Sequence, residues 1–122
     1  MPKQALLVED DPSLRRLVRE YLELARFGVN EVPDGGKAMS ALREQKFDLV
    51  VLDLMLPESS GYDVLEFMHK EGKTQTPVLM MSARSLPEDR AHAEELGARL
   101  YLIKPFTRAE FTRAVRAVTE GA

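Results

Sequence analysis

Five short strand-like runs, four of them apolar, divide the chain into segments of similar length. The most apolar run, 49–52, consists of valine and leucine and stops at the carboxylate of Asp53. An unbroken run of this length between polar residues is typical of a strand buried on both faces, as in a parallel sheet. The runs 5–8, 77–81 and 100–103 are also largely apolar, whereas 29–32 is a weaker run with Asn30 and Glu31 at its centre. The pattern therefore predicts five strands.

The segments between the runs follow a helical pattern. Asp11 is expected to cap a helix that Pro12 opens, and the helix is expected to end at Gly28. Its apolar stripe consists of Leu14, Leu17, Val18, Tyr21, Leu22 and Ala25. Arg15, Arg16 and Arg19 are predicted to form a solvated face beside that stripe.

Capping-box patterns at 85–88 and 107–110 are predicted to open the last two helices. The first of these helices has alanines as its apolar residues between Leu86 and Leu96. It is therefore predicted to bury little area and to be loosely held.

Alternation of five strands with five helices indicates an α/β fold with a parallel sheet and right-handed crossovers. The predicted architecture is a doubly wound (βα)5 sandwich with helices on both faces. Residues 1–122 contain no repeat, low-complexity tract or linker, so they are predicted to form one domain. Periodicity leaves the order of the strands open.

Composition excludes several classes of protein. The chain is 44% hydrophobic and 30% charged, with net charge -3 and no cysteine. These values argue against disorder, direct nucleic-acid binding, disulfides and thiolate metal sites. No apolar stretch approaches the ~20 residues of a membrane span, and the start shows no signal peptide, so a cytoplasmic location is expected.

Four of the predicted strands end in polar residues that are suited to phosphoryl chemistry. Glu9 and Asp10 follow the first run, whereas Asp53, Ser82 and Lys104 end or follow the third, fourth and fifth. Parallel strands have their carboxyl ends at one edge, so these side chains are expected to share a rim. If the first and third strands are neighbours, their carboxylates lie within a few ångströms.

Such a cluster predicts a divalent-cation site. Two carboxylates ~5 Å apart repel by roughly 3 kcal/mol at an effective dielectric of ~20, and a cation relieves that repulsion. All-oxygen ligands favour Mg²⁺ (or Mn²⁺), which accepts a phosphoryl oxygen as a further ligand. Asp53 is then a candidate nucleophile that forms an aspartyl phosphate, with Lys104 and Ser82 as phosphoryl contacts.

Five motifs in this order resemble the response-regulator receiver domain of two-component signalling, over nearly the whole chain. They are Leu-Val-Glu-Asp-Asp at 7–11, Asp-Leu-Val-Val-Leu-Asp-Leu-Met-Leu-Pro at 48–57, Ser-Gly at 60–61, Ser-Ala at 82–83 and Lys-Pro-Phe at 104–106. The resemblance implies a flavodoxin-like sheet in the order 2-1-3-4-5. It also implies a cis peptide bond before Pro105.

The resemblance assigns a role to each candidate residue. Asp53 is the implied phosphoacceptor, and the implied metal ligands are Glu9, Asp10, Asp53 and the backbone carbonyl of Met55. The remaining implied roles are a hydroxyl switch at Ser82, an aromatic switch at Tyr101 and a phosphoryl contact at Lys104. Tyr101 is expected to turn inward when Ser82 and Lys104 move toward the phosphoryl group.

The implied partners are a sensor histidine kinase or phosphotransfer protein, and a downstream protein or fused output domain. The output would meet the face formed by the fourth helix, the fifth strand and the fifth helix. The domain would catalyse its own phosphorylation and slow dephosphorylation without being an enzyme on a separate substrate. No nucleic acid and no membrane is expected as a direct partner.

Several residues bear on alternative functions and on the mode of dimerisation. In many similar receivers with winged-helix output domains, acidic residues at this place pair with basic residues across a dimer. Here Arg99 and Leu100 replace them, which argues against that dimer. His69 and His92 are expected at the surface. A flavodoxin-type cofactor site and an aspartyl phosphatase are disfavoured, since the chain has neither a phosphate-binding loop after residue 8 nor a carboxylate soon after Asp53. A receiver fold that acts as a docking module without phosphorylation remains the alternative.

Overall fold

Five parallel strands form a single sheet at the centre of the molecule. The computed structural model describes residues 2–120. The strands are β1 (Lys3–Val8), β2 (Phe27–Val32), β3 (Leu49–Asp53), β4 (Val78–Ser82) and β5 (Leu100–Ile103). Their order is β2-β1-β3-β4-β5, which confirms the predicted architecture and the strand order implied by the resemblance.

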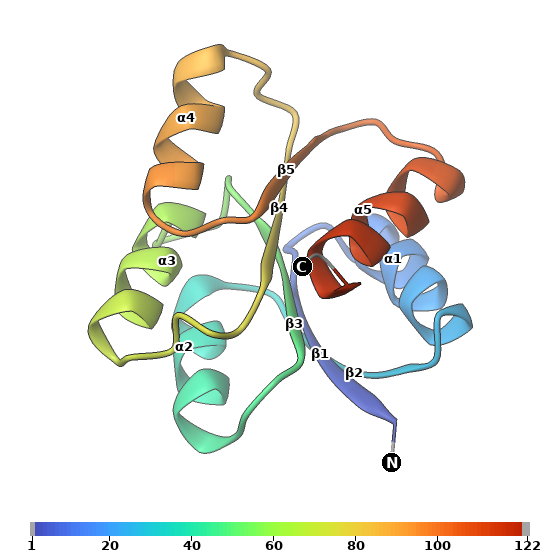
Figure 1. The fold of residues 1–122 in the computed structure, drawn as a ribbon, viewed down its shortest axis with the longest axis horizontal. Coiled ribbons are helices and arrows are strands. Elements are labelled where there is room, and N and C mark those ends of the chain that lie inside the picture. Colours follow the sequence, from blue (N-terminus) through green and yellow to red (C-terminus); the bar gives the residue numbers. More distant parts are fainter. Residues whose placement is uncertain (1, 121–122) are drawn as a thin grey trace.

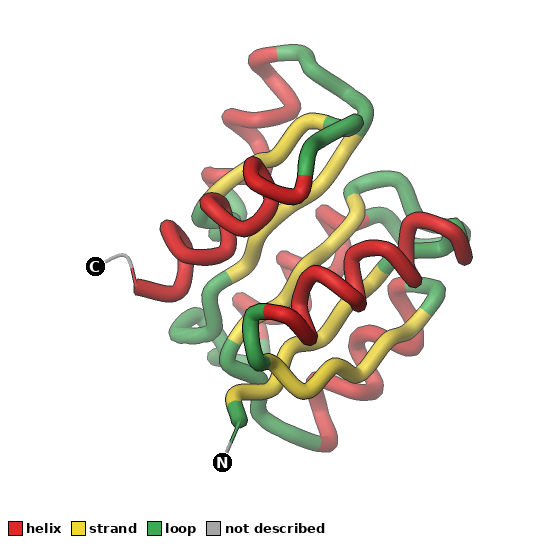
Figure 2. The backbone as a smooth tube through the Cα atoms, turned by 90° about the vertical axis from the view of Figure 1, so that its right-hand side faces the viewer, coloured by secondary structure: helices red, strands yellow, loops and turns green. Residues whose placement is uncertain are grey.

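Helices cover both faces of this sheet. They are α1 (Pro12–Leu24), α2 (Gly35–Glu44), α3 (Gly61–Lys70), α4 (Pro87–Glu95) and α5 (Arg108–Glu120). Helices α1 and α5 lie on one face, and α2, α3 and α4 lie on the other (Figure 1). The view turned by 90° shows the strands between the two layers of helices (Figure 2).

Alternation along the buried strands divides the core into two clusters. In β1, Leu6 and Val8 pack with residues of α2, α3 and α4, whereas Ala5 and Leu7 pack with residues of α1 and α5. Every residue of β3 is buried. The continuous apolar run at 49–52 is therefore explained by a strand covered on both faces.

The first helix is shorter than predicted. It ends at Leu24, and Arg26 turns the chain with a φ of 71°, so Gly28 lies inside β2 rather than at the end of the helix. Leu17, placed on the apolar stripe, is 40% exposed, whereas Val18 and Leu22 are buried. The stripe is thus narrower than the sequence pattern indicated.

Helix caps differ in how well they were predicted. Asp11 caps α1 through the Ser13 N–H, and Thr107 and Glu110 form the expected reciprocal capping box of α5. The box predicted at 85–88 is wrong. Pro87 occupies the first helical position, which makes Leu86 the N-cap, and no side chain within residues 2–120 caps α4 by a hydrogen bond.

Two features of the helices bear on the strand ends. Within α4 only Asp89 and Ala93 are buried, as predicted for a helix with few large apolar residues. Gly61 at the start of α3 lies against the end of β3, where an added Cβ would lie 2.7 Å from the carbonyl oxygen of Asp53. The backbone at Asp53 is therefore held directly by α3.

No helix within residues 2–120 is long and apolar enough to cross a membrane.

Candidate functional site

Three carboxylates meet at the carboxyl edge of the sheet. Val8 of β1 pairs with Leu52 of β3, so Glu9 and Asp53 directly follow a matched pair of residues. Glu9, Asp10 and Asp53 each offer an oxygen within 4.8 Å of the others. Glu9 and Asp53 are buried and Asp10 is exposed, so the cluster opens to solvent on one side. The convergence predicted from the strand ends is confirmed.

Lys104 reaches two of these carboxylates from the loop after β5. Its Nζ atom lies 3.0 Å from Oε1 of Glu9 and 3.1 Å from Oδ2 of Asp53. Burial disfavours the charged amine, but the hydrogen bond to Glu9 and the charge of Asp53 outweigh it and raise the pKa of Lys104. The peptide bond between Lys104 and Pro105 is cis, as the resemblance implied.

The single positive charge of Lys104 does not neutralise the negative charge of the three carboxylates. Burial and the nearby charge of Asp53 raise the pKa of Glu9 to about 7, although Lys104 and the Asp11 N–H act in the opposite direction. The Asp11 N–H donates to Oε2 of Glu9 at 3.1 Å. A second positive charge near these carboxylates would therefore lower their mutual repulsion further.

This raised pKa predicts a pH dependence of stability. The folded protein binds more protons than the unfolded chain between pH 4.5, the ordinary pKa of the group, and about 7. Stability is therefore lost as the pH rises through this window, by on the order of 3 kcal/mol. The glutamine of Glu9→Gln cannot ionise. At pH 8 without divalent cations, the free energy of unfolding of this variant is therefore expected to be roughly 2 kcal/mol higher than that of the wild type.

Urea unfolding in EDTA at pH 5 and pH 8 measures this difference, with the exposed Glu66→Gln on α3 as control. The gain from Glu9→Gln should be clearly larger at pH 8 than at pH 5. Equal gains at both pH values would show that ionisation of Glu9 is not their cause.

The remaining candidate residues lie around the acids. Ser82 ends β4, is fully buried, and accepts a hydrogen bond from the Arg84 N–H at 3.0 Å. The Met55 side chain is 54% exposed, and its N–H donates to Oδ1 of Asp53 at 3.2 Å. The proposed role of the Met55 carbonyl stays a prediction.

Tyr101 already occupies an inward position. Its ring is 2% exposed, and its hydroxyl donates to the carbonyl oxygen of Arg84 at 2.9 Å. Tyr101 is thus buried in this conformation, and its role as a switch on phosphorylation stays a prediction. Tyr101 is joined through Arg84 to the same loop that holds the Ser82 hydroxyl.

A polar group under this loop was missed from the sequence. Asp89 of α4 pairs with Nε of Arg84 at 3.0 Å and accepts a hydrogen bond from the Tyr62 hydroxyl at 3.1 Å. Burial and Asp89 raise the pKa of Tyr62 to about 12. His92 is exposed, as predicted, and its ring packs against that of Tyr62. An acid in the first turn of an alanine-rich helix gives no signal of such contacts.

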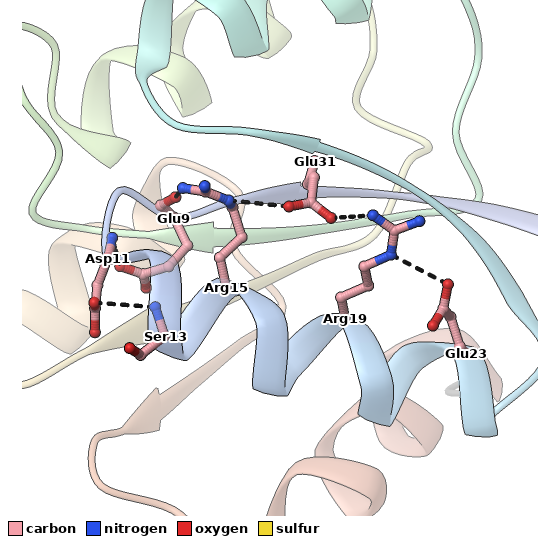
Figure 3. Close-up of polar contacts among 7 residues, drawn as sticks. All are labelled: Glu9, Asp11, Ser13, Arg15, Arg19, Glu23 and Glu31. Carbon is pink, nitrogen blue, oxygen red and sulfur yellow. Dashed lines mark hydrogen bonds and ion pairs between the residues drawn. The ribbon is translucent and has the colours of Figure 1, made fainter.

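Arg15 was also misjudged. Predicted on a solvated face, it is half-buried, and its Nη1 atom donates to the backbone carbonyl of Glu9 at 3.0 Å. Its Nε atom pairs with Glu31 of β2, which also binds Arg19 (Figure 3). Arg19 is 44% exposed, which is closer to the prediction.

The donor set at this edge fits a hard divalent cation. Glu9, Asp10 and Asp53 supply carboxylate oxygens, which Mg²⁺ and Mn²⁺ prefer. The open side at Asp10 leaves space for water or a phosphoryl oxygen as further ligands. The excess of negative charge described above favours such an ion.

Known proteins share this fold and part of this sequence. A family model of the response regulator receiver domain matches residues 5–116. The transcriptional regulatory protein CpxR of Escherichia coli (strain K12) is 41% identical over 113 residues, which cover 93% of this chain and 47% of CpxR. The chain spans about half the length of the curated relatives it matches.

Two solved structures show the same likeness. The chemotaxis protein CheY4 of Vibrio cholerae has a TM-score of 0.89 and 25% identity, with 97% of this chain and 99% of that one covered. The receiver domain of the sensor histidine kinase PA1611 from Pseudomonas aeruginosa PAO1 has a TM-score of 0.89 and 29% identity, with 99% and 100% covered. That crystal structure contains a magnesium ion coordinated in its active-site cleft. The sequence and fold together show that this chain belongs to the response regulator receiver family of two-component signalling.

Proposed function

We propose that this receiver domain is a signalling switch that accepts a phosphoryl group on Asp53. The observation that carries the proposal is the position of this carboxylate. Asp53 is almost fully buried, yet it lies in contact with Lys104 and within 4.8 Å of two further acids. An isolated turn aspartate would not need this surrounding, whereas a phosphoacceptor does.

The transfer is an in-line displacement at phosphorus. A carboxylate oxygen of Asp53 attacks the phosphoryl group of a phosphohistidine on a sensor histidine kinase or phosphotransfer protein. The new O–P bond forms as the N–P bond breaks, and the histidine nitrogen leaves with the electron pair and takes up a proton from solvent. The products are an aspartyl phosphate and a neutral histidine.

The residues around Asp53 have separate roles in this step. Lys104 binds a phosphoryl oxygen and offsets its charge, and the Ser82 hydroxyl donates to another oxygen. Glu9, Asp10, Asp53 and the Met55 carbonyl would hold Mg²⁺ (or Mn²⁺), and the bound cation would neutralise part of the negative charge of the phosphoryl group. The domain promotes its own phosphorylation and slow dephosphorylation, and it is not an enzyme on a separate substrate.

Phosphorylation is read out at the surface formed by α4, β5 and α5. Movement of Ser82 toward the phosphoryl group would release the Arg84 N–H. The backbone carbonyl of the same residue accepts a hydrogen bond from the Tyr101 hydroxyl. The event thus reaches β5 and the loosely held α4, and shifts the populations of their conformations. A downstream protein or fused output domain would bind this surface, in the cytoplasm, without direct contact of this domain with nucleic acid or membrane.

Incubation with acetyl phosphate tests the proposal directly. We treat residues 1–122 as one receiver domain. This domain is expected to gain the mass of one phosphoryl group when Mg²⁺ is present and none in EDTA. Intact-mass spectrometry measures the gain. No gain with Mg²⁺ would favour the alternative, a receiver fold that works as a docking module without phosphorylation.

A further inference from the structure

Arg15 lies behind the acidic cluster, on the α1 side of the loop that carries Glu9 and Asp10. The last pair of the β1–β2 ladder is Val8 with Val32, and the Glu9 N–H still donates to the Val32 carbonyl. The Glu9 carbonyl lies beyond that ladder and accepts its hydrogen bond from Arg15 instead. A side chain of α1 therefore supplies the hydrogen bond to this carbonyl that a neighbouring strand would supply inside the sheet.

Glu31 fixes the direction of this guanidinium. It lies on β2 and accepts from Nε of Arg15 at 3.1 Å, while Nη1 of the same group donates to Glu9 (Figure 3). A guanidinium is planar, so binding at two nitrogens sets the orientation of both bonds at once. Although burial acts in the opposite direction, hydrogen bonds from Arg19 and Arg15 hold the pKa of Glu31 below its ordinary value.

We propose that Arg15 is a positioning residue for the divalent-cation site, acting through the backbone of Glu9. The bond to the Glu9 carbonyl holds the turn from which the Glu9 and Asp10 side chains project toward Asp53. Arg15 touches neither the cation nor the phosphoryl group. The inference rests on the cation site of the proposed function and adds a residue outside it.

Arg15→Ala is expected to weaken Mg²⁺ binding about 10-fold, which is the lower range for loss of an outer-shell contact. Titration with MgCl₂ alone, followed by NMR at the Asp11 and Asp53 amides, measures the affinity. Arg15→Lys has a single ammonium that cannot bind both partners in this geometry, so it should restore the affinity only in part. Glu31→Gln should weaken binding by a smaller factor than Arg15→Ala.

Arg19→Ala is the matched control. Arg19 lies one turn further along α1 and binds the same Glu31, as well as Glu23, but its bonds are to these side chains rather than to Glu9. Its loss should leave Mg²⁺ affinity within about 2-fold of the wild type. Equal weakening by Arg15→Ala and Arg19→Ala would overturn the inference, since it would trace the loss to the Glu31 contact that both arginines share rather than to the bond with the Glu9 carbonyl.

Amide hydrogen exchange without any cation provides a second readout. Arg15→Ala should speed exchange at the Asp11 amide, which donates to the Glu9 carboxylate, and leave the amides of Val18 and Leu22 in α1 unchanged. If the wild type binds no Mg²⁺, the cation site of the proposed function fails, and exchange at Asp11 still decides whether Arg15 positions the loop. If the wild type binds Mg²⁺ and Arg15→Ala matches it in both affinity and exchange, only the role of Arg15 fails.

Discussion

Asp53→Asn is expected to abolish phosphoryl uptake from acetyl phosphate while leaving the domain folded. An amide oxygen is a far weaker nucleophile than a carboxylate, so the O–P bond of the product does not form. Loss of labelling by at least about 100-fold is expected, because covalent catalysis has no second route once the nucleophile is gone. Intact mass after incubation with Mg²⁺ and acetyl phosphate measures it.

The same substitution should slightly stabilise the protein when no cation is present. Glu9 and Asp53 are buried with oxygens within 4.8 Å of each other, so at an effective dielectric of ~20 their charges repel by roughly 3 kcal/mol. The asparagine oxygen still accepts from Lys104, so most of that contact is kept while the repulsion from Glu9 and Asp10 is lost. We expect a net gain of about 1 kcal/mol in the free energy of unfolding at pH 8, measured with urea in EDTA.

Asp48→Asn is the control for phosphoryl uptake. Asp48 immediately precedes β3 and accepts from the Gln4 N–H at 2.7 Å, so it lies at the opposite edge of the sheet from Asp53. It should leave phosphoryl uptake unchanged. Persistent labelling of Asp53→Asn would instead assign the phosphoryl group to another carboxylate of the cluster, with the exposed Asp10 as the first to test.

The convergence of the site could be predicted because it depends on topology. Apolar runs mark buried parallel strands, and parallel strands bring their carboxyl ends to one edge whatever lies between them. Asp53, Glu9 and Lys104 could therefore be placed together although 95 residues separate the last two. The order of the strands came from the family resemblance, since periodicity carries no information about neighbours.

Contacts that depend on side-chain direction could not be predicted in this way. A helical stripe tells which face of α1 is buried, but Arg15 stands at its border and turns its long side chain back to the Glu9 carbonyl. Asp89 is similar, because its burial depends on Arg84 and Tyr62 from two other segments. Leu17 differs in the opposite direction: the stripe predicted it to be buried beside Val18, but it is 40% exposed.

Lys104→Met is expected to be the most destabilising of the substitutions at the site. Lys104 is the cation that contacts both buried carboxylates, and its loss leaves Glu9 and Asp53 without that charge. Removing one partner of a buried ion pair costs about 3–5 kcal/mol, because the remaining charge stays in a poorly solvated place. At pH 8 in EDTA we expect a loss of about 3 kcal/mol in the free energy of unfolding, measured with urea.

Two dependences separate this mechanism from a simple loss of packing. The deficit should shrink at pH 5.5, because Glu9, whose pKa is already raised to about 7, then becomes neutral and no longer needs a counter-ion. It should also shrink when Mg²⁺ is added, because the cluster without the Lys104 charge binds the cation more tightly than the wild type does, so the cation stabilises the folded variant more. Lys104→Arg keeps the charge and should recover most of the stability, and the exposed Lys70→Met on α3 should change little. A deficit that is the same at both pH values and indifferent to Mg²⁺ would mean that the methylene chain of Lys104, rather than its charge, supports the site.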